Sequence, residues 1–96
     1  MRVYISGPIT NNPHYEHEFA VYEHQVKLMG YYPVNPAAHF VEGYTWADYI
    51  KRDIKWLLDC DYIVKIPGWD KSKGARLESR IAEAVGIKEL IIKVVG

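Results

Sequence analysis

The sequence has little cysteine, no long apolar run and no excess of charge of either sign. Cys60 is the only cysteine, which excludes an intramolecular disulfide and disfavours a cysteine-based metal site. The first apolar run turns polar at Ser6, and Lys93 interrupts the late run 90–95, so we expect neither a secretory signal nor a membrane span. Basic and acidic residues both number 12, so no overall field attracts a nucleic acid polymer or an anionic membrane. We therefore expect a cytoplasmic protein with neither of these partners.

The composition is that of one packed globular unit. Apolar residues make up 49% of the chain and charged residues 25%, which lies well outside the range of disordered sequences. A chain of 96 residues fills a single core. We predict one domain over residues 1–96.

Strand-like and helix-like patterns alternate along the chain. Short β-branched and aromatic runs predict strands at 2–6, 31–34, 62–66 and 90–95. Apolar spacing and end signals predict helices from Asn12-Pro13 to Gly30, from Trp46 to Asp59, and from Ser72–Gly74 to Val85, with a capping box at Thr45 and Asp48. The predicted inward faces of the first two helices are Tyr15, Phe19, Tyr22, Val26 and Met29, and Trp46, Tyr49, Ile50, Ile54, Leu57 and Leu58. This order predicts an α/β, three-layer sandwich of flavodoxin-like or Rossmann-like type, with about four parallel strands and helices on both faces.

Such sheets bind ligands beyond the carboxyl ends of their strands. Here that edge comprises Ser6-Gly7-Pro8, the loop after Val34 and residues 67–74. Tyr4 shares a strand face with Ser6, so it either places a hydroxyl beside the ligand edge or belongs to the core.

Glu78 lies on the apolar face of the third predicted helix, three residues after Ala75 and four before Ala82. Burying a lone carboxylate costs several kcal/mol, so the residue needs a partner or a function. The helix dipole at this early position favours the ionised form, which makes Glu78 a candidate nucleophile. A structural bond to a neighbouring strand or loop is the alternative.

Asp53 interrupts the second predicted helix in the same way, four residues after Tyr49 and four before Leu57. An aspartate at such a position caps a loop, pairs with a basic side chain or acts on a ligand. Its sequence neighbours Lys51 and Arg52 are expected to point elsewhere, so neither is its natural partner.

The third predicted helix begins with the ingredients of an anion site. Ser72 supplies a hydroxyl, Lys73 a cation and Gly74 a flexible backbone at a helix amino terminus, although Ser72 is also a simple N-cap candidate. Trp46 and Trp69 are core residues or stack on a base, and Trp69 is the better stacking candidate. The four histidines have no metal-ligand spacing, so we expect them to be solvated and no metal to be bound.

Three motifs together resemble the nucleoside 2-deoxyribosyltransferase superfamily across most of the chain. They are Tyr4-Ile5-Ser6-Gly7-Pro8, Asp53-Ile54-x-Trp56-Leu57 and Ser72-x-Gly74-x-x-x-Glu78. The second and third look particularly like the 2′-deoxynucleoside 5′-monophosphate N-glycosidase branch. The brevity of the chain is similar to that of an uncharacterised family common in phage and bacterial genomes.

The resemblance implies a reaction in which a helix glutamate attacks C1′ of deoxyribose, a tyrosine orients it and an aspartate helps to protonate the departing base. These catalytic roles fall on Glu78, Tyr4 and Asp53. The predicted substrate-binding residues are Ser6, Gly7, Pro8, Trp69, Ser72, Gly74 and Arg76. The implied substrate is a nucleoside or nucleotide, without a cofactor. A homo-oligomer, most simply a dimer, is expected because longer members complete their sites with a neighbouring subunit.

The sequence departs from that branch at two positions. Arg76 stands where a second glycine is usual, and Thr10 or one of its neighbours stands where the first loop usually has an arginine. Arg76 either supplies the missing cation or obstructs the pocket. The alternative functions are a nucleotide-binding module of the same fold without turnover, and a scaffold that dimerises through the tyrosine-rich first helix.

Overall fold

The computed structural model describes residues 1–94, in which strands and helices alternate as predicted. The elements are β1 (Arg2–Ser6), α1 (Tyr15–Leu28), β2 (Tyr32–Val34), the 3-10 helix η1 (Pro36–Ala38), α2 (Trp46–Leu58), β3 (Tyr62–Lys65), the 3-10 helix η2 (Trp69–Lys71), α3 (Lys73–Val85) and β4 (Lys88–Glu89). The strands form one sheet in the order β2-β1-β3-β4, and all neighbouring pairs are parallel. The predicted α/β class with a parallel sheet is confirmed.

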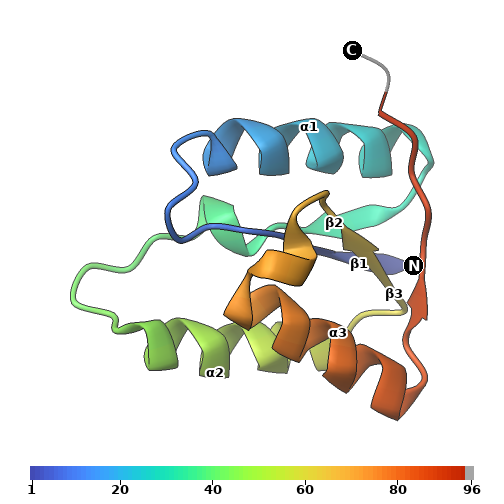
Figure 1. Ribbon diagram of the computed structural model, residues 1–96. Helices are drawn as coiled ribbons and strands as arrows, with labels where there is room; N and C mark the ends of the chain where they lie inside the picture. The colour runs from blue at the N-terminus through green and yellow to red at the C-terminus, as the bar shows by residue number, and fades with distance from the viewer. Residues whose placement is uncertain (95–96) are drawn as a thin grey trace.

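Helices cover both faces of this sheet, with α1 on one side and α2 and α3 on the other (Figure 1). Side chains of β1 alternate between the two layers, as the pleat of a strand requires. Ile5 packs against Phe19 of α1, whereas Tyr4 packs with Leu57 of α2 and Ala82 of α3. Residues of β1 that share the face of Tyr4 therefore point to the two helices that carry the predicted acids.

The starts of α2 and α3 follow the local sequence signals. Thr45 Oγ1 accepts a hydrogen bond from the Asp48 amide at 3.2 Å, and Asp48 Oδ2 accepts one from the Thr45 amide at 2.9 Å, which completes the predicted capping box. Ser72 Oγ accepts from the Ala75 amide at the start of α3. Gly86 ends this helix with a φ of 83°, a left-handed conformation that favours glycine.

The start of α1 differs from the prediction. The helix begins at Tyr15, and His14 in the N-cap position makes no side-chain cap. Asn12 instead donates from Nδ2 to the carbonyl oxygen of Pro8 at 2.9 Å and to Glu18 at 2.6 Å. Asn12 therefore braces the turn after β1 against the helix rather than capping the helix itself.

The last strand is shorter and earlier than predicted. Residues 90–94 of the predicted 90–95 strand lie outside any strand, and Val95 lies outside the described residues. The Leu90 amide still donates to the carbonyl oxygen of Ile63 at 2.8 Å, and Leu90 and Ile92 pack against a core cluster. The chain then runs past the sheet beside α1 (Figure 1). Leu90 thus continues the pairing with β3 through one backbone hydrogen bond, and Ile92 reaches the core by packing.

Three residues predicted to face the core lie at helix ends and are largely exposed. Met29 follows α1, Trp46 opens α2 and Leu58 closes it; the last of these is 51% exposed. Leu57, the neighbour of Leu58 on α2, is fully buried. Because adjacent helix positions diverge by about 100°, Leu58 is turned away from the core that Leu57 enters.

Candidate functional site

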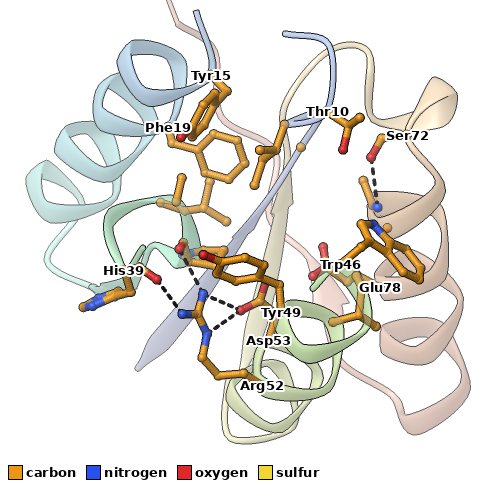
Figure 2. Close-up of a pocket in the computed structure, with 18 of the residues that line it drawn as sticks. Thr10, Tyr15, Phe19, His39, Trp46, Tyr49, Arg52, Asp53, Ser72 and Glu78 are labelled. Carbon is orange, nitrogen blue, oxygen red and sulfur yellow. Dashed lines mark hydrogen bonds and ion pairs between the residues drawn. The ribbon is translucent and has the colours of Figure 1, made fainter. Parts of the chain in front are cut away.

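A pocket of about 320 Å³ lies at the carboxyl ends of the strands, at the predicted edge of the sheet (Figure 2). Its walls come from the end of β1 and the following loop, the start of α1, the segment around η1, one face of α2 and the start of α3. Most of the lining is apolar, and its carboxylates are Asp53 and Glu78. The volume suits a small organic ligand.

Glu78 is 5% exposed and receives a hydrogen bond on each carboxylate oxygen. The Tyr4 hydroxyl donates to Oε2 at 2.5 Å, and Ser6 Oγ donates to Oε1 at 2.7 Å. The two donors stand two residues apart on β1 and therefore share a face. Ser6 was predicted to touch substrate, but it is buried behind the pocket lining and acts on Glu78 instead.

Burial raises the pKa of Glu78 from 4.5 to about 7, although the hydrogen bonds from Tyr4 and Ser6 oppose the rise. The negative charge of Asp53 adds to it. The expected pull of the helix dipole towards the ionised form is thus outweighed by burial. Burial and the charge of Glu78 also raise the pKa of Tyr4 well above its ordinary value, so the Tyr4 hydroxyl remains a donor at neutral pH.

Asp53 is 6% exposed and pairs with its sequence neighbour, which corrects the expectation that Arg52 points elsewhere. Arg52 Nε and Nη2 lie 3.0 and 2.9 Å from Oδ1 of Asp53. Adjacent helix positions diverge by about 100°, but the long arginine side chain curls back, and the carbonyl groups of Pro36 and His39 hold its guanidinium in place. Burial raises the pKa of Asp53, while Arg52 and His39 partly offset this rise.

The two acids predicted to meet around a shared hollow therefore line the same pocket. They are coupled, since the charge of Asp53 contributes to the raised pKa of both Glu78 and Tyr4. Two carboxyl groups with different neighbours in one apolar pocket form an arrangement suited to nucleophilic or acid–base chemistry.

Ser72 and Gly74 line the pocket at the start of α3, where the anion site was predicted. Each also has a structural task. Ser72 Oγ caps the helix by accepting from the Ala75 amide at 3.2 Å. A Cβ at Gly74 would lie 3.0 Å from Ile50 Cδ1, so glycine lets α2 and α3 approach closely.

The cation on this side of the pocket is Lys73 rather than Arg76. Arg76 is exposed, does not line the pocket and directs Nη1 to the carbonyl oxygen of Asp70 at 3.4 Å. It therefore neither obstructs the pocket nor supplies it with a charge. Lys73 lines the pocket, and so does Thr10.

Of the two tryptophans considered for stacking, Trp46 lines the pocket and Trp69 does not. Trp69 does not line the pocket, and Nζ of Lys65 lies 4.5 Å from the centroid of its ring. Trp46 lines the pocket at the start of α2, with Nζ of Lys73 at 4.5 Å from its ring centroid. The start of α2 lies next to the start of α3, with Trp46 Cζ2 3.9 Å from the position of a Cβ at Gly74, and spacing along one helix does not reveal this contact.

Gly7 and Pro8 shape the turn after β1. A Cβ at Gly7 would lie 2.8 Å from Ile66 Cβ, closer than real contacts allow, so this position requires glycine. Pro8 lies outside the lining, with its ring 3.4 Å from the position of a Cβ at Gly68. Gly7 therefore gives the pocket a backbone wall, whereas Pro8 faces Gly68 and not the pocket.

The lining residues that sequence reasoning missed include His39, Tyr49 and Arg52. His39 is exposed, as expected of the histidines, but lies at the pocket edge. A signal for Arg52 was present, since Tyr49 and Trp56 stand three residues before and four residues after it on one helix face. Their ring centroids lie 5.1 and 4.3 Å from Cζ of Arg52, so the cation lies against both aromatic rings.

Two other features concern metals and membranes. No group of three or more His, Cys, Asp or Glu side chains within residues 1–94 is placed to hold a metal ion. In the same part of the chain, no helix has the length and apolar character needed to cross a bilayer.

Fold and site together define a small α/β protein with a parallel sheet and two buried carboxylates in a ligand-sized pocket. The chain belongs to the family described as DUF4406, a domain of unknown function, whose model matches residues 1–91. No curated protein and no solved structure matches the chain. All the site residues named above lie within the matched range.

Proposed function

We propose that this protein cleaves or transfers the N-glycosidic bond of 2′-deoxynucleosides or their 5′-monophosphates, with Glu78 as the nucleophile. The observation that supports this most strongly is that two buried carboxylates, Asp53 and Glu78, line one pocket while Tyr4 donates to Glu78. The resemblance of the three motifs points to the same reaction.

In the first step an oxygen of ionised Glu78 attacks C1′ of the sugar, and the bond from C1′ to the base nitrogen breaks. Positive charge develops on the sugar in the transition state, and a carboxylate in an apolar pocket stabilises it strongly. The electron pair leaves with the base, which takes the proton of protonated Asp53. The sugar is left as an ester on Glu78.

In the second step a nucleophile attacks C1′ and releases Glu78. If water attacks, its proton passes to ionised Asp53 and the products are free sugar and base. If a nitrogen of a second base attacks, its proton passes to Asp53 and a new nucleoside is formed. Both routes return the two carboxyl groups to their starting states.

The lining offers contacts for the rest of such a substrate. Trp46 and Tyr49 present aromatic rings on which a base can stack. Lys73 provides a positive charge for a 5′-phosphate beside the free amides at the start of α3. Arg52 does not serve this purpose, because its donors are engaged with Asp53, Pro36 and His39.

The test is to incubate the protein with deoxynucleosides, their 5′-monophosphates and the matching ribonucleotides, and to follow free base by chromatography. We expect Glu78→Gln to abolish release and Asp53→Asn to slow it on the order of a hundredfold, as loss of a general acid typically does. Glu83→Gln, at an exposed position of the same helix, is the matched control and should retain full activity. Base release that persists in Glu78→Gln would exclude the assigned nucleophile.

A nucleotide-binding module without turnover is the second candidate, and one observation favours it. Asp53 is paired with Arg52, which stabilises the ionised form and so opposes proton donation. This alternative predicts that deoxynucleotides raise the melting temperature without any release of base. Thermal shift measured beside the chromatographic assay separates the two functions.

A further inference from the structure

Arg52 lies where α2, the segment around η1 and Asp53 meet, with a side chain that is 14% exposed. Its Nε and Nη2 reach Oδ1 of Asp53, Nη1 donates to the carbonyl oxygen of His39, and Nη2 donates to that of Pro36 at 3.2 Å. These contacts engage most of the five N–H groups of a guanidinium. Figure 2 shows the arginine reaching from α2 to these partners.

Aromatic rings hold the same guanidinium. Its Cζ lies 5.1 Å from the ring centroid of Tyr49 and 4.3 Å from that of Trp56. Both rings come from α2, so the cation is held by its own helix as well as by the segment opposite. An arginine with its donors and faces engaged orients a neighbour rather than capturing a substrate.

The pairing leaves one oxygen of Asp53 for the pocket. Arg52 reaches Oδ1, and no hydrogen bond from the described residues reaches Oδ2. No fully buried side-chain oxygen or nitrogen in that part of the chain lacks a partner, so Oδ2 must be accessible. Because Asp53 lines the pocket, this oxygen is the one that a ligand meets.

We infer that Arg52 is a positioning residue for Asp53: it holds Oδ1 and thereby presents Oδ2 to the pocket as the oxygen that exchanges a proton with the leaving base. This inference rests on the proposed function and specifies how its acid is held. When the proton has passed to the base, Asp53 is ionised, and the guanidinium is already placed to stabilise it.

Several charged or titratable groups face Asp53 from the elements around it. They are Arg52 on α2, His39 after η1, Tyr4 on β1 and Glu78 on α3. Arg52 acts on Asp53 through both hydrogen bonds and charge. Its removal should therefore raise the pKa of Asp53, whereas removal of a loop contact that does not touch the carboxylate should leave it unchanged.

The experiment is a carboxyl-carbon NMR titration of the protein with labelled aspartate, with the Asp53 signal assigned by Asp53→Asn. The variants are Arg52→Met, which removes the charge, and Arg52→Lys, which keeps it on a flexible stem. Tyr49→Phe is the matched control. It removes the hydroxyl, which bonds the backbone of Val41 at 2.9 and 3.0 Å, and it leaves the aromatic ring that lies against Arg52. Base release is measured on the same samples over a range of pH.

We expect the Asp53 titration to move to higher pH in Arg52→Met, to a smaller extent in Arg52→Lys, and not in Tyr49→Phe. Turnover in Arg52→Met should fall on the order of tenfold in kcat with a smaller change in KM, as loss of one hydrogen bond to a charged group typically costs. Added guanidinium ion should restore part of the turnover of Arg52→Met, and urea should not.

An unchanged Asp53 titration in both Arg52 variants would overturn the inference. So would an equal shift in Tyr49→Phe, since the effect would then pass through the loop. If the titration shifts as expected but the unmodified protein releases no base, the proposed reaction fails while the hold of Arg52 on Asp53 stands.

Discussion

Replacement of Glu78 by glutamine should change how stability depends on pH. In the folded protein burial raises the pKa of Glu78 to about 7, against 4.5 for an ordinary glutamate. Between these two values Glu78 binds more protons in the folded state than in the unfolded state, so its contribution to the free energy of unfolding falls as pH rises. Below pH 4.5 both states are protonated and this cost is absent, whereas above pH 7 it is present in full.

The magnitude follows from the two pKa values. At about 1.4 kcal/mol for each pH unit, the rise from 4.5 to about 7 corresponds to about 3 kcal/mol. Glutamine does not ionise, so the variant lacks this cost. The difference in unfolding free energy between the variant and the unmodified protein should therefore shift by about 3 kcal/mol in favour of the variant between pH 4 and pH 8. For a domain of this size the shift corresponds to about 12 to 24 °C in melting temperature.

Urea unfolding at several pH values measures this difference directly. Glutamine also changes the hydrogen bonding to Tyr4 and Ser6, which alters the unfolding free energy of the variant by an amount that does not depend on the ionisation of residue 78. The pH dependence of the difference in unfolding free energy therefore still reports that ionisation. Glu83→Gln removes a carboxylate from an exposed position of α3 and controls for net charge. A difference that stays constant from pH 4 to pH 8 would refute the reasoning that burial governs the charge of Glu78.

Three further substitutions test other parts of the argument. Ser6→Ala removes a hydrogen bond that lowers the pKa of Glu78, so the rise of base release with pH should move to higher pH; a profile that does not move would argue against this contact. Gly7→Ala places a Cβ 2.8 Å from Ile66 Cβ and should lower the free energy of unfolding in urea by about 1 to 3 kcal/mol, and a neutral result would mean that the turn yields easily. Thr45→Ala breaks the capping box and should cost about 1 kcal/mol in the same assay, whereas no loss would show that the cap contributes nothing to stability.

The layers of the fold could be predicted because each depends on local patterns. Strand runs that end at glycine or proline and helices with end signals define the alternation, and a parallel sheet follows from it. The two acids could be found for a related reason: Asp53 and Glu78 interrupt apolar faces, and a buried carboxylate needs a partner. Placement of both at one edge then follows from the rule for parallel sheets.

The residues that were mispredicted depend on contacts between elements and on the exact face that a side chain takes. Trp46 lies against Lys73 of α3 at the pocket, whereas Leu58 is turned away from the core that its neighbour Leu57 enters. Arg52 depends on side-chain length, because its guanidinium bridges to the loop carbonyls at Pro36 and His39. Helical spacing describes the direction of Cβ and not the reach of a long side chain.

The different partners of the two acids support the division of roles between them. Glu78 is held by two neutral hydroxyl donors, which both require an accepting oxygen and so match the ionised form, while burial keeps the pKa near neutrality. Asp53 instead faces a fixed positive charge that stabilises it after it has lost a proton. A substrate that develops positive charge next to Glu78 lowers the cost of its ionisation, so the carboxylate would reach full charge during the step in which it acts. The two hydroxyl donors would then stabilise the ionised form of Glu78 and the guanidinium the ionised form of Asp53, each in the step of the proposed reaction in which that form occurs.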